Sequence, residues 1–454
     1  MTFGKTLLVS ASALALITPA AVQAKRPTRH AAAGATSAQL EEMRKEIEDL
    51  KARLDAAEAA QHDAATSAAS AQEQAAAAAT QAQAAATQAQ AAQAQATQVA
   101  TAQADDDKTV KLFKSGWFNN TSISGRMYFN FSNIDQKSNG AKTTATGTGF
   151  NIKRFYLGVD HKFNDVFSGN LTTDISDVAG TSGNLVGRGL YVKKAYLQAK
   201  LNPALIIRLG SADMPWIPYA ENQYGYRHIE NTLIDRTSFG TSADWGIHVL
   251  GDLAGGLLSY QVSVVDGGGY RNVKVTKSVD VEGRVSAQYK GFYAAVGGYS
   301  GKRAADVQNA VTHHTATRID GLVGYKNKMF NLGAEYFHTK DWNQVTTVAE
   351  EKADGYSIFA NVNFHKNWSV FGRYDWVKPT KLANDNLKDQ YFNVGLQWEP
   401  VKIVDLALVY KRDKVENGTF GTSNGTIGGA NPVGSLVGGR GTYDEVGLFG
   451  QLRF

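Results

Sequence analysis

Basic residues recur at alternate positions in segments that are otherwise rich in aromatic residues. In "GRMYFNFS" Arg126 shares one strand face with Tyr128 and Asn130, and in "KRFYLGVD" Arg154 shares a face with Tyr156. The planar guanidinium fork of Arg fits the oxygens of phosphate and carboxylate groups, and Lys adds a mobile positive charge. Other basic side chains on faces of this kind include Lys194, Arg208, Arg284 and Arg373. Together they predict reversible contact with small anions.

Acidic side chains fall on the same faces and give a second interpretation. They are Asp174, Glu282, Asp320, Glu335 and Asp375. These carboxylates could pair with the basic residues across a wall and only hold the structure together. An excess of fixed positive charge in a narrow lumen would instead favour anions over cations. The sequence alone leaves both interpretations open.

The sequence offers no local motif in a context that supports catalysis or metal binding. No H-E-x-x-H motif occurs, and the one G-x-S-x-G match, residues 421–425, lies in a long Gly-rich connection and not in a strand–turn–helix. The nearest approach to a phosphate-binding loop, "VGGYSGKR", has Val296 where Gly is needed. His313 and His314 are adjacent in a predicted loop and make a poor ligand pair. Cysteine is absent, which excludes disulfides and thiol chemistry. We expect no enzyme activity, no cofactor, no metal and no nucleic-acid partner.

The faces described above belong to strands, because apolar and polar residues alternate with a period of two. In "WSVFGRYDWV" Trp368, Val370 and Tyr374 lie on one face, and Arg373 and Asp375 lie on the other. Many segments of this kind reach about 9 to 12 residues, the length that crosses a bilayer at a tilt. Mean hydropathy is −0.29, which excludes a helical membrane protein. The net charge is +5, and the basic excess lies after Lys108.

Sixteen such segments are predicted between residues 115 and 454. They are 123–134, 149–162, 166–177, 190–201, 204–213, 244–253, 257–267, 279–290, 291–302, 316–327, 330–340, 354–366, 368–377, 389–399, 403–413 and 443–454. Short connections such as "HKFND" and "NPA" alternate with long ones such as residues 214–243. An even strand count with this alternation predicts an all-β fold, a 16-stranded antiparallel transmembrane β-barrel of the outer-membrane type.

Aromatic residues at strand ends fit this architecture. The chain ends in "EVGLFGQLRF", where Leu448, Leu452 and Phe454 share the apolar face. We expect Phe454 to close the last strand at the membrane interface. Other candidates for an interfacial aromatic girdle are Trp368, Trp376, Tyr391, Trp398 and Tyr410.

The N-terminal quarter has a different organisation. Residues 1–24 have a Lys, an apolar core and a small-residue cleavage site, which is the pattern of a secretory signal peptide. In residues 37–104 apolar residues, mostly Ala, recur at spacings of three and four, and "AAATQAQ" occurs twice in tandem. This pattern predicts a helical coiled coil in the periplasm, although a disordered Ala/Gln linker is the alternative.

Three stretches carry a resemblance to a known family. They are "GFNIKRFYLGVDHKFND", "KKAYLQAKLNPALIIRLGSADMPWIPYAE" and "HIENTLIDRTSFGTSADWGIHVLGDL". They resemble the strand motifs of the phosphate-selective porin O/P family of Gram-negative outer membranes, over most of residues 120–454. The resemblance implies a homotrimer of sixteen-stranded barrels in the outer membrane, surrounded by lipid, that passes phosphate or related small anions.

The resemblance also assigns a role to the 214–243 connection. In sixteen-stranded porins this loop typically folds inward and forms the constriction, and here its basic candidates are Arg227, His228 and Arg236. An external loop is the alternative. For the whole chain, the alternatives are a porin for sugars or other small solutes, or a structural tether between the outer membrane and the periplasm that acts through the coiled coil.

Overall fold

The computed structural model describes residues 40–52, 55, 119–177 and 188–454. Residues 40–52 form a helix in which the predicted heptad positions Leu40, Met43, Ile47 and Leu50 are exposed. This is one short helix, and the coiled coil predicted for residues 37–104 is not shown; the rest of that segment and the signal peptide of residues 1–24 lie outside the described residues. Among the described residues, no helix has the length and hydrophobicity to span a membrane.

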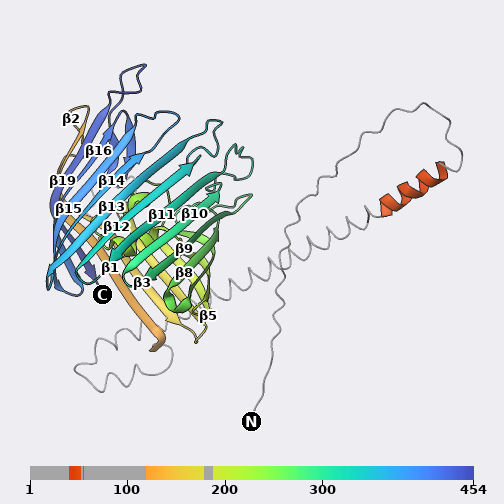
Figure 1. Cartoon of the computed structure of the whole chain (residues 1–454), viewed down its shortest axis with the longest axis horizontal. Coiled ribbons are helices and arrows are strands. Elements are labelled where there is room, and N and C mark those ends of the chain that lie inside the picture. Colours follow the sequence, from red (N-terminus) through yellow and green to blue (C-terminus); the bar gives the residue numbers. More distant parts are fainter. Residues whose placement is uncertain (1–39, 53–54, 56–118, 178–187) are drawn as a thin grey trace, which may run out of the picture. The chain divides into compact units, whose positions relative to one another are not determined.

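The second part of the chain is a closed antiparallel sheet whose wall has sixteen long strands (Figure 1). They are β1 (Thr121–Ser138), β3 (Gly147–Lys162), β4 (Phe167–Asp177), β5 (Arg188–Asn202), β6 (Leu205–Asp213), β7 (Ala243–Leu253), β8 (Leu258–Val265), β9 (Asp280–Tyr289), β10 (Phe292–Gly301), β11 (Ala316–Lys326), β12 (Phe330–Lys340), β13 (Lys352–His365), β14 (Trp368–Lys378), β15 (Lys388–Val401), β16 (Val404–Glu416) and β19 (Arg440–Arg453). Each pairs with the next, and β19 pairs with β1. The predicted sixteen-stranded barrel is therefore confirmed.

The remaining elements lie in the connections. A two-residue strand, β2 (Ala141–Lys142), pairs with β1, and β17 (Thr419–Thr422) pairs with β18 (Gly425–Gly428) in a small hairpin. The helices are α3 (Ile217–Tyr224), α4 (Leu233–Arg236) and the 3-10 turn η2 (Ala254–Gly256). The hairpin was not predicted from the sequence. It contacts the loop between β6 and β7.

The two faces of the wall differ as the alternation predicts. In β14 the side chains of Trp368, Val370 and Tyr374 are exposed, while Arg373 and Asp375 are buried on the inner side. Large apolar side chains that are exposed on other wall strands include Phe131, Leu190, Val296, Ile319, Ile358, Val394 and Leu408. An exposed apolar band with a polar interior is typical of membrane barrels.

The aromatic residues predicted to form an interfacial girdle differ in their exposure. Trp368 and Trp398 are exposed neighbours on β14 and β15, with ring centroids 5.9 Å apart at the short-turn end. Phe454 is also exposed, and its backbone exchanges hydrogen bonds with Gly125 of β1 at 2.8 and 3.0 Å. The prediction for Tyr391 is wrong. Its ring is fully buried on the inner face, because Asp389, Tyr391 and Asn393 alternate on the lumen side of β15.

Candidate functional site

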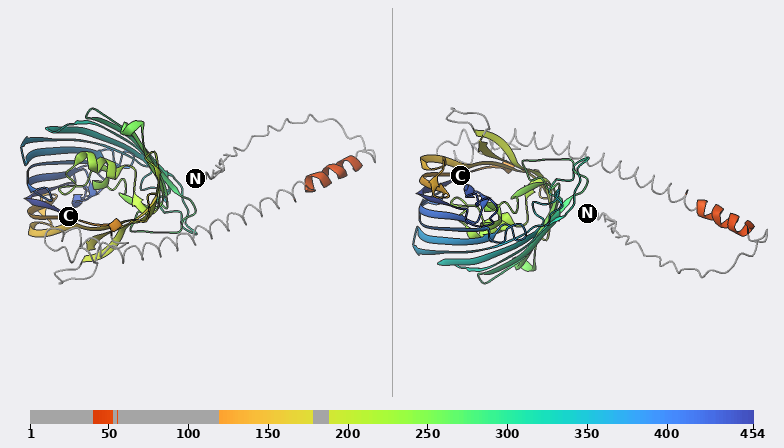
Figure 2. Two further views of the ribbon diagram at one scale, coloured as in Figure 1. Left: turned by 90° about the horizontal axis from the view of Figure 1, so that it is seen from below. Right: turned by 90° about the horizontal axis from the view of Figure 1, so that it is seen from above.

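The loop between β6 and β7, residues 214–242, lies inside the barrel (Figure 2). Its apolar residues Trp216, Ile217, Leu233, Ile234 and Phe239 are buried with inward side chains of the opposite wall. The wall residues of this cluster are Tyr293, Ala295, Tyr299, Ala316, Leu322, Phe337, Ala353 and Val377, on β10 to β14. A hydrophobic contact inside a polar barrel holds the loop against this side of the wall.

Polar contacts fix the start and the end of the loop. The Trp216 indole N–H donates to Glu335 Oε1 at 2.7 Å, and the Trp216 backbone N–H donates to Glu282 Oε1 at 3.0 Å. Near the other end, Arg318 Nη1 donates to the carbonyl of Phe239 at 2.7 Å. Because all of these groups are buried, removing one partner would leave an unpaired polar group in the interior.

Arg236, at the end of α4, is the centre of a buried ionic cluster. Its guanidinium donates to Asp375 at 2.9 Å, to Asp413 at 3.0 Å and to Asp389, and all four side chains are fully buried. Its planar group also lies over the ring of Tyr391, 4.7 Å from the centroid. Arg236 therefore fastens the loop to β14, β15 and β16. This differs from the solute-facing position that the sequence predicts.

Arg373 and Arg284 also contact the loop rather than open space. Arg373 pairs with Asp375 and donates to the carbonyl of Asn231 at 2.5 Å, and only 4% of its surface is exposed. Arg284 donates to the carbonyl of Pro215 at 2.9 Å and stacks on Tyr219 at 4.3 Å. Both residues were predicted to line the pore and bind anions. In the structure Arg373 donates to a carboxylate and a loop carbonyl, and Arg284 donates to a loop carbonyl and to the hydroxyls of Ser259 and Ser286.

A second loop, residues 417–439, closes over the first. The hairpin of β17 and β18 brings Ser423 against α4, where its N–H donates to the Arg236 carbonyl at 2.8 Å. Its hydroxyl donates to Glu230 at 2.6 Å, and Glu230 in turn pairs with Lys411 at 3.1 Å. The two loops therefore occupy one side of the lumen, from β9 to β16.

The other side of the lumen keeps an open cavity of about 400 Å³ between α3 and the wall of β1, β3, β4, β5, β6 and the end of β19. Five basic and three acidic side chains line it: Arg126, Lys193, Lys194, Arg227, Arg453, Asp160, Asp213 and Glu221. The excess of positive charge therefore lies on the side of the lumen that the loop between β6 and β7 leaves open. The predicted residues Arg126, Lys194 and Arg227 come together here.

Two β-bulges increase the positive charge on this side of the barrel. Thr172 pairs with Lys194 and Thr173 pairs with Val192, so Lys193 is the extra residue on β5. In the same way Lys153 is the extra residue on β3, beside Arg154. A bulge sets two residues opposite one and interrupts the alternation. Lys193 and Lys194 both reach the cavity for this reason, and sequence parity missed Lys193.

The cavity cations differ in their partners. Lys194 pairs with Asp213 at 3.0 Å, and Arg227 pairs with Glu221 at 2.5 Å and Asp235 at 3.2 Å. Arg126 donates only to the Tyr128 hydroxyl, at 3.4 Å, among its side-chain contacts with described residues.

Lys193 is held mainly by aromatic rings. Its ammonium donates to the Tyr156 hydroxyl at 3.3 Å and lies 4.6 Å from the centre of that ring and 5.8 Å from that of Tyr270. Within the described part of the chain, neither Lys193 nor Arg126 forms an ion pair with a carboxylate. These two positive charges are therefore not neutralised by direct pairing.

Three predicted residues lie elsewhere. Arg154 pairs with Asp174 at 2.7 Å, and Arg208 donates to Gln198 at 2.9 Å; neither lines the cavity. His228 is buried, with its ring 6.3 Å from that of Tyr128, and burial together with the charge of Lys153 lowers the pKa of His228 to about 3. A neutral imidazole at this position adds no charge to the lumen.

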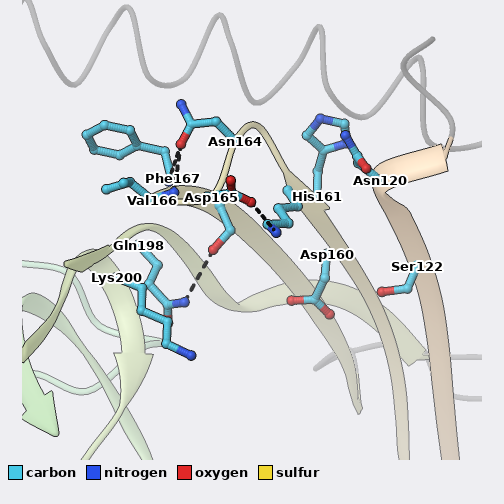
Figure 3. A pocket seen from close by; sticks show the side chains of 12 residues that line it. Asn120, Ser122, Asp160, His161, Asn164, Asp165, Val166, Phe167, Gln198 and Lys200 are labelled. Carbon is cyan, nitrogen blue, oxygen red and sulfur yellow. Dashed lines mark hydrogen bonds and ion pairs between the residues drawn. The ribbon is translucent and has the colours of Figure 1, made fainter. Parts of the chain in front are cut away.

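A smaller hollow of about 290 Å³ lies at the short-turn rim beside the β3–β4 connection (Figure 3). There Lys162 pairs with Asp165 at 2.8 Å, and the Asn164 carboxamide accepts the backbone N–H of Phe167 at 2.8 Å. Asp165 is almost fully exposed, so its ion pair with Lys162 contributes little to the stability of the fold. Among the described residues, no group of three His, Asp or Glu side chains could hold a metal ion.

Comparison with known proteins places the fold. No protein-family model matches the sequence, and no curated protein is significantly similar to it. The anion-selective porin from Comamonas acidovorans has a TM-score of 0.52 and 14% identity, over 74% of this chain and 99% of that chain. The outer membrane channel DcaP of Acinetobacter baumannii has a TM-score of 0.51 and 14% identity, over 74% and 97%. The chain has a porin fold.

Proposed function

We propose that this chain is a passive outer-membrane porin that prefers anions, with phosphate and related oxyanions as its solutes. The observation that carries the proposal is the cavity along β1 to β6, where basic side chains outnumber acidic ones and two cations lack a carboxylate partner among the described residues. The exposed apolar band supports a place in the outer membrane. The structurally similar porin from Comamonas acidovorans is named anion-selective, which agrees with the charge of this cavity.

The arrangement suits passage rather than tight binding. Arg126, Lys193 and Arg227 line one cavity but come from the wall strands β1 and β5 and from the inner loop, so an anion would meet cations one after another. Several weak contacts let a solute leave as well as enter, which transport requires. The guanidinium fork of Arg126 fits two oxygens of a phosphate group, and this supports oxyanions over halides.

Conductance of the full chain in planar lipid bilayers tests the proposal. In a salt gradient the reversal potential should show that anions are more permeant than cations, and phosphate should carry current. A cation preference would contradict the anion proposal and leave a general porin. Equal uptake of neutral sugars and of phosphate into proteoliposomes would favour the alternative of a porin for other small solutes.

The helix at residues 40–52 supports a second role in the same chain. Its exposed residues Leu40, Met43, Ile47 and Leu50 follow heptad spacing and lack a partner helix within the described residues. We propose that three copies pair these surfaces in the periplasm, which would join a homotrimer and tether the barrel. Deletion of residues 37–104 should leave conductance unchanged and weaken the trimer in chemical cross-linking; an intact trimer would contradict this role.

A further inference from the structure

The outer face of the barrel carries an apolar groove across β9 to β13, with a cavity volume of about 630 Å³. Its floor is a row of small and medium side chains that are paired in register from strand to strand. The row runs Ala287, Ala294, Val323, Ala334 and Ile358. Because three of the five are Ala, the outer surface is depressed along this row.

Larger side chains form the wall of the groove toward the short turns. Tyr289, Phe292, Tyr325 and Leu332 are paired in the next row, and the rings of Phe292 and Tyr325 meet edge to face with centroids 4.7 Å apart. Tyr289 and Phe292 have more than half of their surface exposed. This wall has the composition of an interfacial girdle, so the groove begins where lipid headgroups meet hydrocarbon.

Positive charge gathers directly beyond this wall. The turns 290–291, 327–329 and 366–367 carry Lys290, Lys328 and Lys366, and Lys326 ends β11 beside them. All four lysines are exposed, and none forms an ion pair with a described residue. The segments 286–296, 322–334 and 359–371 contain no Asp or Glu.

The lysines lie close to the groove through their backbone connections. The N–H of Lys326 donates to the Gly291 carbonyl at 2.8 Å, which joins the first two turns. The ammonium of Lys290 lies 5.1 Å from the ring centre of Tyr289 in the groove wall. Basic residues at other short turns are paired with acids, such as Lys162 with Asp165 and Arg453 with Glu399.

The geometry points to a binding site for one anionic phospholipid, with an acyl chain in the groove and the phosphate among Lys290, Lys326 and Lys328. This inference rests on the proposed membrane insertion of the barrel. Apolar contact alone cannot select a lipid, because all bilayer lipids have acyl chains. Selectivity has to come from the headgroup, and clustered lysines beside the membrane favour anionic lipids.

The test uses the full chain in nanodiscs of equal parts phosphatidylglycerol and phosphatidylcholine with identical acyl chains, followed by native mass spectrometry of the released protein. We expect retained phosphatidylglycerol to exceed phosphatidylcholine. The triple variant Lys290→Gln, Lys326→Gln, Lys328→Gln should lose most of this preference, by roughly fivefold per lysine. The matched control replaces the rim lysines Lys162, Lys200 and Lys402 with Gln and should retain it.

A second variant tests the groove without changing charge. Ala294→Phe fills the floor on the outer face, so the lumen is untouched, and it should reduce the number of retained phosphatidylglycerol molecules. Equal retention of both lipids by the unaltered chain, or an equal loss in the control triple variant, would overturn the inference. A change of oligomeric state in Ala294→Phe with normal lipid retention would assign the groove to a second copy and overturn it as well. A barrel that retains phosphatidylglycerol but conducts no anions would contradict only the proposed porin function.

Discussion

The two sides of the lumen use the same residue types differently. From β9 to β16, Arg318, Arg373 and Arg236 are buried and bonded to carboxylates, and Arg318 and Arg373 also bond to loop carbonyls. On β1 and β5, Arg126 donates to the Tyr128 hydroxyl and Lys193 contacts the hydroxyl and ring of Tyr156. Both line the cavity, where Arg126 is exposed and Lys193 is 8% exposed. An inward-facing cation therefore says little about transport until its partners are known. Carboxylate and carbonyl partners mark the anchors, whereas the cations that the proposed function uses have no carboxylate partner among the described residues.

The stability of the barrel and the position of the inner loop should depend most strongly on Arg236. Replacing it with Met leaves buried Asp389 and Asp413 without their shared partner, so we expect a loss of about 3–5 kcal/mol of unfolding free energy. The loop should also leave the wall and alter the conductance. Urea unfolding followed by tryptophan fluorescence measures the loss, and Arg227→Met, in the same loop on the open side, is the control. Equal stability of the two variants would show that the ionic cluster is not the anchor.

Packing at the start of the loop should have the next largest effect. A Cβ on Gly297 of β10 would lie 2.6 Å from Trp216 Cε3. Gly297→Ala should therefore displace the indole and cost about 1–3 kcal/mol, as overpacking does. Gly321→Ala is the matched control, because its Cβ would meet no atom within 4 Å. The same unfolding measurement compares them, and a wild-type midpoint for Gly297→Ala would contradict the packing described here.

The open side should respond in selectivity rather than stability. Lys193→Gln and Arg126→Gln each remove a cation that has no carboxylate partner in the described residues, so the anion-to-cation permeability ratio should fall by roughly two- to fivefold. Lys153→Gln is the control, since Lys153 occupies the other bulge and donates to the Ile229 carbonyl at 2.8 Å instead of lining the cavity. If Lys153→Gln changes the reversal potential as much as Lys193→Gln and Arg126→Gln do, the cavity is not the path of the anions.

The smallest effect should come from Asp213, and it has the opposite sign. Asp213→Asn releases Lys194 from its 3.0 Å ion pair and removes one negative charge from the cavity. The anion preference should increase, by roughly twofold. Asp165→Asn, at an exposed pair on the rim, should leave the reversal potential unchanged. A lower anion preference in Asp213→Asn would mean that Asp213 positions Lys194 for the solute.

The wall was predictable because its strands have an exposed apolar face outside and a polar face inside. This difference between the two faces gives the wall strands an alternation of apolar and polar residues, as in residues 368–377. The predicted and observed strand ends therefore differ by only a few residues. The two bulges break the period by one residue each. A signal for them exists, since strict parity would turn Lys153 and Lys193 toward hydrocarbon, at a cost of about 2–4 kcal/mol near the bilayer centre.

The interior was less predictable because its contacts join distant parts of the chain. Arg236 meets Asp413, 177 residues later, and no local pattern indicates that pair. The hairpin of β17 and β18 did have a local signal in the Asn424–Gly425 dipeptide, although in the structure the turn residues are Ser423 and Asn424, and Gly425 is the first residue of β18. Its inward direction, which brings Ser423 onto α4, depends on the shape of the filled lumen and was not available from the sequence.

The pairing of β1 with β19 joins the first strand of the wall to the last, over thirteen paired positions from Arg126–Arg453 to Ser138–Gly441. A closed sheet has no edge strand, but the pairing of β1 with β19 cannot form before the last residues have been synthesised. Until then the first and last strands of the sheet would be edge strands, and their unpaired backbone N–H and C=O groups could pair with other polypeptide chains. A chain truncated before residue 440 would lack β19, and β1 and β16 would remain as two unpaired edge strands that can associate with other chains.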